Sequence, residues 1–231
     1  MENIYIQALN QIISNQKTEL RETPFKMIKF NSNIKIMLEL IEKMTKAEQK
    51  ISALIKLLGL YDYYTKIHAQ NVAHLSKKIA INLNLTQIEI KNSYLAGLLH
   101  DIGKTMIPLK ILNKKKALTE AEFLLIKKHS IWGYQILKEI SDLKEIANYV
   151  LYHHEKWNGE GYPKGLKTKE IPLIAQIVAL ADAWDAMCSD RPYKKAMPQT
   201  KALVQIKANM GQQFSPQIVK IFLDNLKIAN N

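Results

Sequence analysis

Apolar residues recur at helical spacing along most of the chain from about residue 46 onward. Between residues 65 and 82, for example, Val72, Leu75 and Ile79 fall on one face of a helix. Strand-like alternation is nearly absent after residue 45. The pattern therefore predicts an all-α bundle, with helices over residues 51–59, 65–82, 87–100, 120–129, 132–140, 143–152, 171–187, 199–210 and 216–226.

Local signals predict where several of these helices begin and end. Thr86 and Thr119 are each followed three residues later by a glutamate, Glu89 and Glu122 respectively, which is the pattern of a capping box at a helix N-terminus. Gly59 follows an apolar helical run and predicts a helix C-terminus, because glycine readily adopts the left-handed conformation found there.

The first 50 residues are less regular and carry no recognisable motif. Ile4, Leu9 and Ile12 are roughly helix-spaced, whereas residues 25–40 mix strand-like alternation with a helical pattern. We expect residues 1–50 to form a mostly helical N-terminal appendage that serves as a sensory, docking or dimer element. Residues 51–231 would then form the main domain.

The formal charge of +12 indicates either a lysine-rich composition bias or an anionic partner such as a nucleotide, nucleic acid or acidic surface. Only Arg21 and Arg191 are arginines among the 33 basic residues. Because specific reading of DNA bases depends on the arginine fork, this composition argues against a sequence-specific DNA-binding protein but not against a phosphate-binding one.

Composition also indicates the cellular compartment in which the protein works. Cys188 is the only cysteine, so no disulfide can form within the chain. The first residues lack the basic and apolar regions of a signal peptide, and no run of about 18 apolar residues predicts a membrane span. We therefore expect a cytoplasmic protein without membrane contact.

Candidate chemistry is concentrated at histidines and aspartates near predicted helix ends. His153 and His154 are adjacent and precede a glycine-rich turn, the pair His100-Asp101 follows an apolar helix, and Asp182 lies inside another apolar run. Each histidine taken singly could be an ordinary hydrogen-bonded or surface residue. Together they indicate a metal centre with nitrogen and oxygen ligands, which suits iron, manganese, nickel, cobalt or catalytic zinc. The single cysteine excludes a structural cysteine-zinc site.

Two longer motifs carry a family resemblance. His100-Asp101-Ile102-Gly103-Lys104 together with His153-His154-Glu155 and Gly159-Glu160-Gly161-Tyr162-Pro163 resembles the HD-GYP family of bacterial metal-dependent phosphodiesterases, which hydrolyse cyclic di-GMP. The resemblance extends over about residues 51–225. It implies an HD-type helical bundle and a hydrolase domain over residues 51–231.

The resemblance also implies a set of seven metal ligands and two divalent metal ions, for which iron or manganese is the first expectation. The implied ligands are His68, His100, Asp101, His129, His153, His154 and Asp182. If Asp101 bridges, one ion has His68, His100, Asp101 and Asp182, and the other has Asp101, His129, His153 and His154. A shared hydroxide would then attack the phosphodiester. Tyr64 stands where some relatives have a glutamate ligand for a third metal, so two metals are expected.

Other residues match family positions that contact substrate. Lys104, Arg191 and Lys194 would bind substrate phosphate, with Asp101 and Lys104 closest to the reaction. Tyr162 would contact substrate from the loop Gly159–Pro163, which is also a candidate surface for a signalling partner.

The first interpretation is therefore a phosphodiesterase that converts cyclic di-GMP to the linear dinucleotide pGpG, with GMP as a further product left open. The same chemistry on another cyclic dinucleotide or phosphoester is the nearest alternative. A catalytically silent nucleotide receptor that signals through residues 1–50 is an alternative of a different class. The hypothesis of a nucleic-acid-binding protein rests on the net charge alone. The sequence leaves open whether the chain forms a homodimer.

Overall fold

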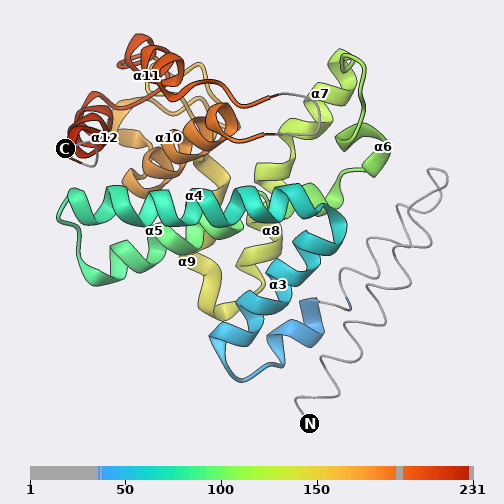
Figure 1. Cartoon of the computed structure of the whole chain (residues 1–231). Helices are drawn as coiled ribbons and strands as arrows, with labels where there is room; N and C mark the ends of the chain where they lie inside the picture. Colours follow the sequence, from blue (N-terminus) through green and yellow to red (C-terminus); the bar gives the residue numbers. More distant parts are fainter. Residues whose placement is uncertain (1–35, 37, 191–194, 229–231) are drawn as a thin grey trace.

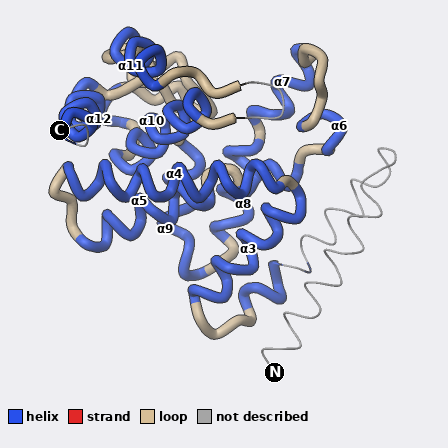
Figure 2. Tube along the Cα trace, in the orientation of Figure 1, coloured by secondary structure: helices blue, strands red, loops and turns tan. Residues whose placement is uncertain are grey.

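The computed structural model describes residues 36, 38–190 and 195–228. Within these ranges the chain is helical, apart from loops and an isolated bridge between Met210 and Phe214 (Figures 1 and 2). The all-α prediction is confirmed. The helices are α3 (Ala47–Tyr61), α4 (Tyr63–Asn82), α5 (Gln87–Leu99), α6 (Leu109–Leu112), α7 (Glu120–Lys127), α8 (His129–Lys138), α9 (Lys144–Tyr152), α10 (Leu173–Cys188), α11 (Gln199–Ala208) and α12 (Pro216–Ile228), with short 3-10 helices η1 (Ile102–Met106), η2 (Ser141–Leu143) and η3 (Thr168–Glu170).

The predicted capping boxes are present at the start of α5 and α7. The hydroxyl oxygens of Thr86 and Thr119 accept the amides of Glu89 and Glu122, and each glutamate carboxylate accepts the backbone amide of its threonine. Each box satisfies two amides that the first turn of a helix otherwise leaves unpaired. Both helix starts were therefore predictable from local sequence.

Two predicted boundaries are wrong. Gly59 does not end a helix, because α3 continues to Tyr61 and stops only where Asp62 adopts extended backbone. The Asp62 carboxylate accepts the amides of Tyr64 and Thr65 and so caps the start of α4. His129 begins α8 instead of ending α7, because the helical pattern is interrupted at Lys128.

Helices α4 and α5 run side by side through the centre of the bundle, and α10 packs on both (Figure 1). Gly97 of α5 permits the close approach: a Cβ at this position would lie 2.9 Å from Cα of Ala73 on α4. Fully buried aliphatic side chains from four helices meet in the core, among them Leu58, Val72, Leu99 and Val178. This packing fixes where the C-terminal end of α5 lies relative to α4 and α10.

The chain before α3 also contacts this core. Residues 38–42 are helical, and Ile41 and Met44 are buried with the core cluster. Residues 1–35 and 37 lie outside the described part of the chain, so most of the predicted N-terminal appendage stays a prediction. None of the helices in the described ranges combines the length and apolar content needed to cross a lipid bilayer.

An ion-pair network around one buried lysine connects residues 38–42 to the bundle. Lys50 of α3 is only 5% exposed, and its Nζ lies 2.8 Å from Asp142 Oδ2 of η2 and 3.2 Å from Glu42 Oε2. The Glu42 carboxylate also accepts the amide of Ser141. Residues 38–42, α3 and the distant η2 therefore meet at one ammonium group.

Removing the two carboxylates should cost more stability than removing the lysine. The double variant Glu42→Gln/Asp142→Asn leaves a buried ammonium without a counter-charge, and we expect it to lose about 3–5 kcal/mol of unfolding free energy. Lys50→Met leaves two half-exposed carboxylates that water can solvate, so we expect a loss below about 2 kcal/mol. Chemical denaturation measures both variants. A larger loss in Lys50→Met than in the double variant would contradict this account.

Candidate metal centre

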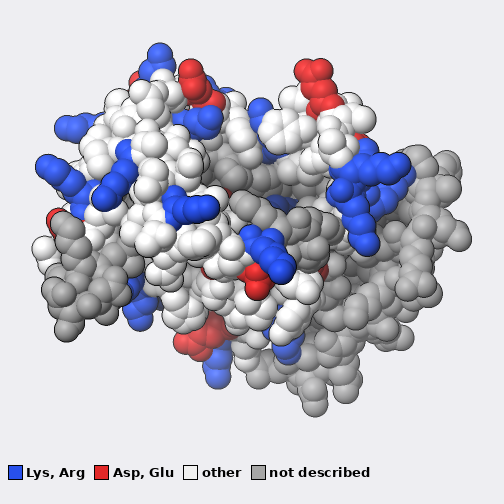
Figure 3. Space-filling view, turned by 45° about the horizontal axis from the view of Figure 1, so that its top comes forward, with Lys and Arg blue, Asp and Glu red and all other residues white. Residues whose placement is uncertain are grey.

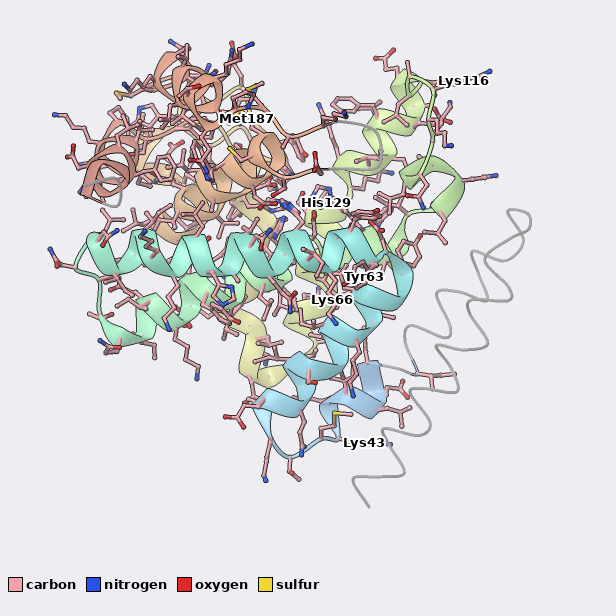
Figure 4. The ribbon with its side chains drawn as sticks, viewed as in Figure 1. Lys43, Tyr63, Lys66, Lys116, His129 and Met187 are labelled. Atoms are coloured by element: carbon pink, nitrogen blue, oxygen red, sulfur yellow. The ribbon has the colours of Figure 1, made fainter. Side chains whose placement is uncertain are left out.

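The seven predicted ligands come from five different elements and converge in the described structure. His68 lies on α4, and Asp182 lies on α10. His100 caps the C-terminal end of α5, and His153 caps that of α9. His129 is the first residue of α8. Figure 4 shows His129 above α4, with nitrogen and oxygen atoms gathered nearby. His100, Asp101, His129 and His153 are each 1% exposed, which is unusual for residues of these types.

The ligand atoms form two groups that share a boundary at Asp101. His68, His100 and Asp101 make one group, and His129, His153 and His154 make the other, with all ligand atoms in each group within 4.8 Å of one another. Asp101 Oδ2 lies 3.3 Å from His100 Nε2, and Asp101 Oδ1 lies 3.6 Å from His129 Nε2. Asp182 Oδ1 adds to the first group at 3.0 Å from His68 Nε2. One carboxylate therefore faces both groups.

Three of the histidines are oriented in the same way. Nδ1 of His100, His129 and His153 lies 2.6–2.7 Å from the carbonyl oxygen three residues earlier, on Gly97, Ile126 and Val150 respectively. A carbonyl oxygen can only accept, so each Nδ1 carries the proton. In the neutral ring the lone pair is then on Nε2, which points into the centre. Because the last carbonyls of a helix lack intrahelical partners, these rings also cap the helix ends.

This arrangement leaves nitrogen lone pairs facing one another. His129 Nε2 and His153 Nε2 are 3.3 Å apart, and neither neutral ring has a proton there to donate. His100 Nε2 is buried and has no hydrogen-bond partner within the described residues. An unsatisfied buried acceptor is costly, and a cation coordinated by these nitrogens removes the cost. The donor set of imidazoles and carboxylates therefore fits divalent metal ions.

The local electrostatics keep the second group of histidines neutral. Burial lowers the pKa of His129 to about 4 and that of His154 to about 3, and it lowers the pKa of His153 well below its usual range. Burial alone would raise the pKa of Asp101, but His100, Lys104 and His129 hold it well below its usual value. At neutral pH the second group thus offers neutral imidazoles, and Asp101 offers an ionised carboxylate, which are the forms that bind metals.

His68 is oriented by a carboxylate that the sequence interpretation left without a role. Its Nδ1 lies 2.6 Å from Asp185 Oδ2, while Asp185 Oδ1 accepts from Asn71 Nδ2 at 2.9 Å and from Ser189 Oγ at 2.7 Å. A carboxylate behind a ligating histidine fixes the ring and raises its basicity. Burial lowers the pKa of His68, but Asp182 and Asp185 outweigh it and raise the pKa to about 9. The spacing of Asp182 and Asp185, three residues apart on one helix, was the available signal.

The other predicted site residues are only partly placed. Lys104 Nζ lies 2.6 Å from Asp101 Oδ2, and the Tyr162 ring stacks on the His154 ring at 4.8 Å between centroids. Lys127 Nζ lies over the Tyr162 ring, 5.1 Å from the ring centre, which is a cation–π contact. Arg191 and Lys194 lie outside the described residues.

A buried glutamate holds the loop that follows the histidine pair. Glu155 is 3% exposed, and its two carboxylate oxygens accept the amides of Lys164 and Leu166 at 2.7 and 3.0 Å. Gly161 has no space for a side chain, because a Cβ there would lie 2.3 Å from the amide nitrogen of Lys156. The loop is thus folded back onto its own start, with Tyr162 beside the second histidine group.

Comparison with known proteins identifies the family of the chain. The family model for the HD domain matches residues 44–218. The chain is 37% identical over 217 residues to a cyclic di-GMP phosphodiesterase of Thermotoga maritima, covering 88% of this chain and 59% of that protein. It is 36% identical over 167 residues to a 3'3'-cGAMP-specific phosphodiesterase of Vibrio cholerae, covering 72% of this chain and 36% of that protein. The chain therefore spans only part of the length of these relatives.

A solved structure shares the fold. An HDG"Y"P protein from Bdellovibrio bacteriovorus superimposes with a TM-score of 0.59 at 23% identity, covering 95% of this chain and 70% of that chain. The match to the family model includes every one of the seven clustered residues. The resemblance inferred from the two motifs is confirmed, and the chain belongs to the HD domain family.

Proposed function

We propose that this chain is a metal-dependent phosphodiesterase that hydrolyses cyclic di-GMP to pGpG. The observation that carries the proposal is the pair of ligand groups meeting at Asp101, whose histidine nitrogens are buried, neutral and aimed at a shared centre. The names of the sequence relatives support cyclic dinucleotides as the substrate class. Hydrolysis of a second bond to give GMP belongs to the same proposal as a later step.

Two divalent ions, with iron or manganese as the first expectation, would supply an activated water and neutralise charge on the phosphate. His68, His100, Asp101 and Asp182 would hold one ion, and Asp101, His129, His153 and His154 the other. Lys104, one turn beyond Asp101, would pair with a non-bridging phosphate oxygen once Asp101 is engaged by metal. We assign Arg191 and Lys194 to the same phosphate on sequence resemblance alone.

Tyr162 would form the wall of the substrate site beside the second ion. Its ring stacks on one face of the His154 ring. Tyr162 belongs to the loop whose backbone amides bind the Glu155 carboxylate. We propose that it contacts the substrate instead of a metal. The same loop is our candidate contact surface for a signalling partner, and a homodimer and a cytoplasmic location belong to the proposal too.

The test compares two histidine variants in protein purified without oxygen. His153→Ala should lose metal and at least about 100-fold in cyclic di-GMP turnover, because an inward-facing ligand is removed. His74→Ala is the control: His74 lies on α4, is exposed, and its Nδ1 donates to the carbonyl oxygen of Gln70, so it faces away from the ligand groups. Metal content and product chromatography report on both.

The control should keep wild-type metal content and turnover. Tight binding of cyclic di-GMP without hydrolysis under iron, manganese or nickel would sink the proposal and favour the receptor alternative. Turnover in metal-free wild-type protein would sink it as well.

A further inference from the structure

A cavity of about 260 Å³ opens beside the metal centre and is not explained by metal binding. Its wall includes His68 and Lys104, so it is continuous with the proposed reaction site. The other walls come from the start of α4, the end of α6 and the end of α10. Sites that enclose drug-sized ligands usually measure about 300–1,000 Å³, so this cavity suits one part of a cyclic dinucleotide rather than the whole molecule.

One wall of the cavity is apolar and includes an exposed aromatic ring. Tyr64 is 56% exposed and Ile67, three residues later on the same face of α4, is 39% exposed. Leu112 at the end of α6 also lines the cavity. Large apolar side chains left in water beside a polar centre mark a contact surface when they line a concave site. An exposed tyrosine ring is suited to stacking with a nucleobase.

The neighbouring wall carries carboxylates, although the chain as a whole has a net charge of +12. Asp62, Asp185 and Asp190 all line the cavity. Asp185 is engaged with His68, and Asp62 caps α4, but Asp190 is exposed and accepts the Ala196 amide through Oδ1. A carboxylate has about four acceptor positions, so Asp190 can accept further donors. Guanine presents N–H donors on the edge where adenine presents an unprotonated ring nitrogen.

Three lysines follow directly after the cavity-lining residues Leu112 and Asn113. Figure 3 shows basic side chains spread over the surface, with a group of them at the right of the view. Lys114, Lys115 and Lys116 lie between α6 and α7, and Figure 4 shows Lys116 on that side of the molecule. A phosphate would be attracted to Lys104 and the metals, whereas the three aspartates disfavour a phosphate inside the cavity itself. The cavity chemistry therefore suits the base of a nucleotide whose phosphate lies at the centre.

We propose that this cavity is a nucleobase subsite in which Tyr64 stacks on a purine and Asp190 favours guanine over adenine. The proposal rests on the proposed function, since the phosphate of the same nucleotide must lie at the metal centre. It places Tyr64 and Asp190 among the residues that determine which cyclic dinucleotide is preferred.

The first test measures the contribution of the base to binding, without turnover. Calorimetry on metal-loaded protein compares GMP with ribose 5-phosphate, which has no base. In Tyr64→Ala we expect the ratio of GMP affinity to ribose 5-phosphate affinity to fall about tenfold. The variant loses the aromatic ring on which the base stacks, and one such stacking contact changes affinity by about that factor. Tyr64→Phe keeps the ring and should keep the preference. Tyr63→Ala is the matched control, because Tyr63, labelled in Figure 4, is 64% exposed at the start of α4 and is not among the residues that line the cavity.

The second test concerns the choice of base. Asp190→Asn should narrow the ratio of GMP to AMP affinity by several-fold, since the amide can donate to adenine as well as accept from guanine. The same variants are then assayed for turnover of cyclic di-GMP, 3'3'-cGAMP and cyclic di-AMP. Tyr64→Ala should raise the KM for cyclic di-GMP more than it lowers kcat.

Several results would overturn the subsite. Equal weakening of GMP and ribose 5-phosphate in Tyr64→Ala would do so, as would a loss of equal size in Tyr63→Ala. A third equivalent of metal that disappears in Tyr64→Ala would show that the cavity holds a cation. If the base contributes to binding but no cyclic dinucleotide is hydrolysed, the subsite stands and the proposed function fails.

Discussion

Asp101→Asn is expected to remove both metal ions and to lower cyclic di-GMP turnover by at least about 10³-fold. The side chain is 1% exposed, and its oxygens lie 3.3 Å from His100 Nε2 and 3.6 Å from His129 Nε2, so it faces both ligand groups. The asparagine amide has nearly the same shape, but it is uncharged and offers only one acceptor oxygen. Elemental analysis of purified protein and turnover assays measure the two effects together.

Asp182→Asn is the matched control for that result. Asp182 Oδ1 lies 3.0 Å from His68 Nε2 and 4.0 Å from His100 Nε2, so it belongs to the first group alone. This variant should keep about one metal per chain, held by the second group. Two metals retained in Asp101→Asn, or none in Asp182→Asn, would contradict the assignment of Asp101 to both groups.

Gly103→Ala is expected to destabilise the protein by about 3 kcal/mol or more and to lower metal content with it. A Cβ at this position would lie 1.9 Å from the carbonyl oxygen of His129 and 2.5 Å from the amide nitrogen of Gly133. Both neighbours are backbone atoms, so η1 and α8 must move apart. Asp101 precedes η1 and His129 begins α8, so the separation pulls ligands out of position. Chemical denaturation and metal analysis test the two effects.

Gly59→Ala provides the comparison. It is a helix-interior glycine whose Cβ would approach only the flexible end of the Lys66 side chain, at 2.6 Å from Cδ. Alanine is the better helix former by about 1 kcal/mol, so this variant should be neutral or more stable. A similar loss in both variants would show that the contact between η1 and α8 is not the cause.

The helical class and most helix boundaries could be predicted, because they depend on spacing and caps that are local in sequence. Thr86 and Thr119 are examples, since each cap involves residues only three positions apart. The boundary at Gly59 could not be predicted this way, because it depends on whether Asp62 caps the next helix. Likewise, the break at Lys128 places His129 at a helix start, and no residue type there signals it.

In the candidate site, too, the residues could be named from the sequence, but their arrangement could not. The seven candidate ligands were named from motif resemblance, and their convergence needs contacts between helices that are far apart in the sequence. Asp185 was quoted within a motif, but its role behind His68 depends on α4 and α10 lying together. The cavity at Tyr64 is equally a product of packing, since its walls come from three separate elements. Spacing alone could not have shown either feature.

The histidines that end helices have a thermodynamic consequence for the whole bundle. His100, His129 and His153 each bond a carbonyl in the last turn of α5, α7 or α9, so the negative ends of three helix dipoles surround the two ligand groups. Without a cation, the partial negative charges and unshared lone pairs gathered here lower the stability of the folded state. Metal binding is therefore linked to folding: occupancy shifts the unfolding equilibrium by mass action, and the melting temperature becomes a gauge of metal supply.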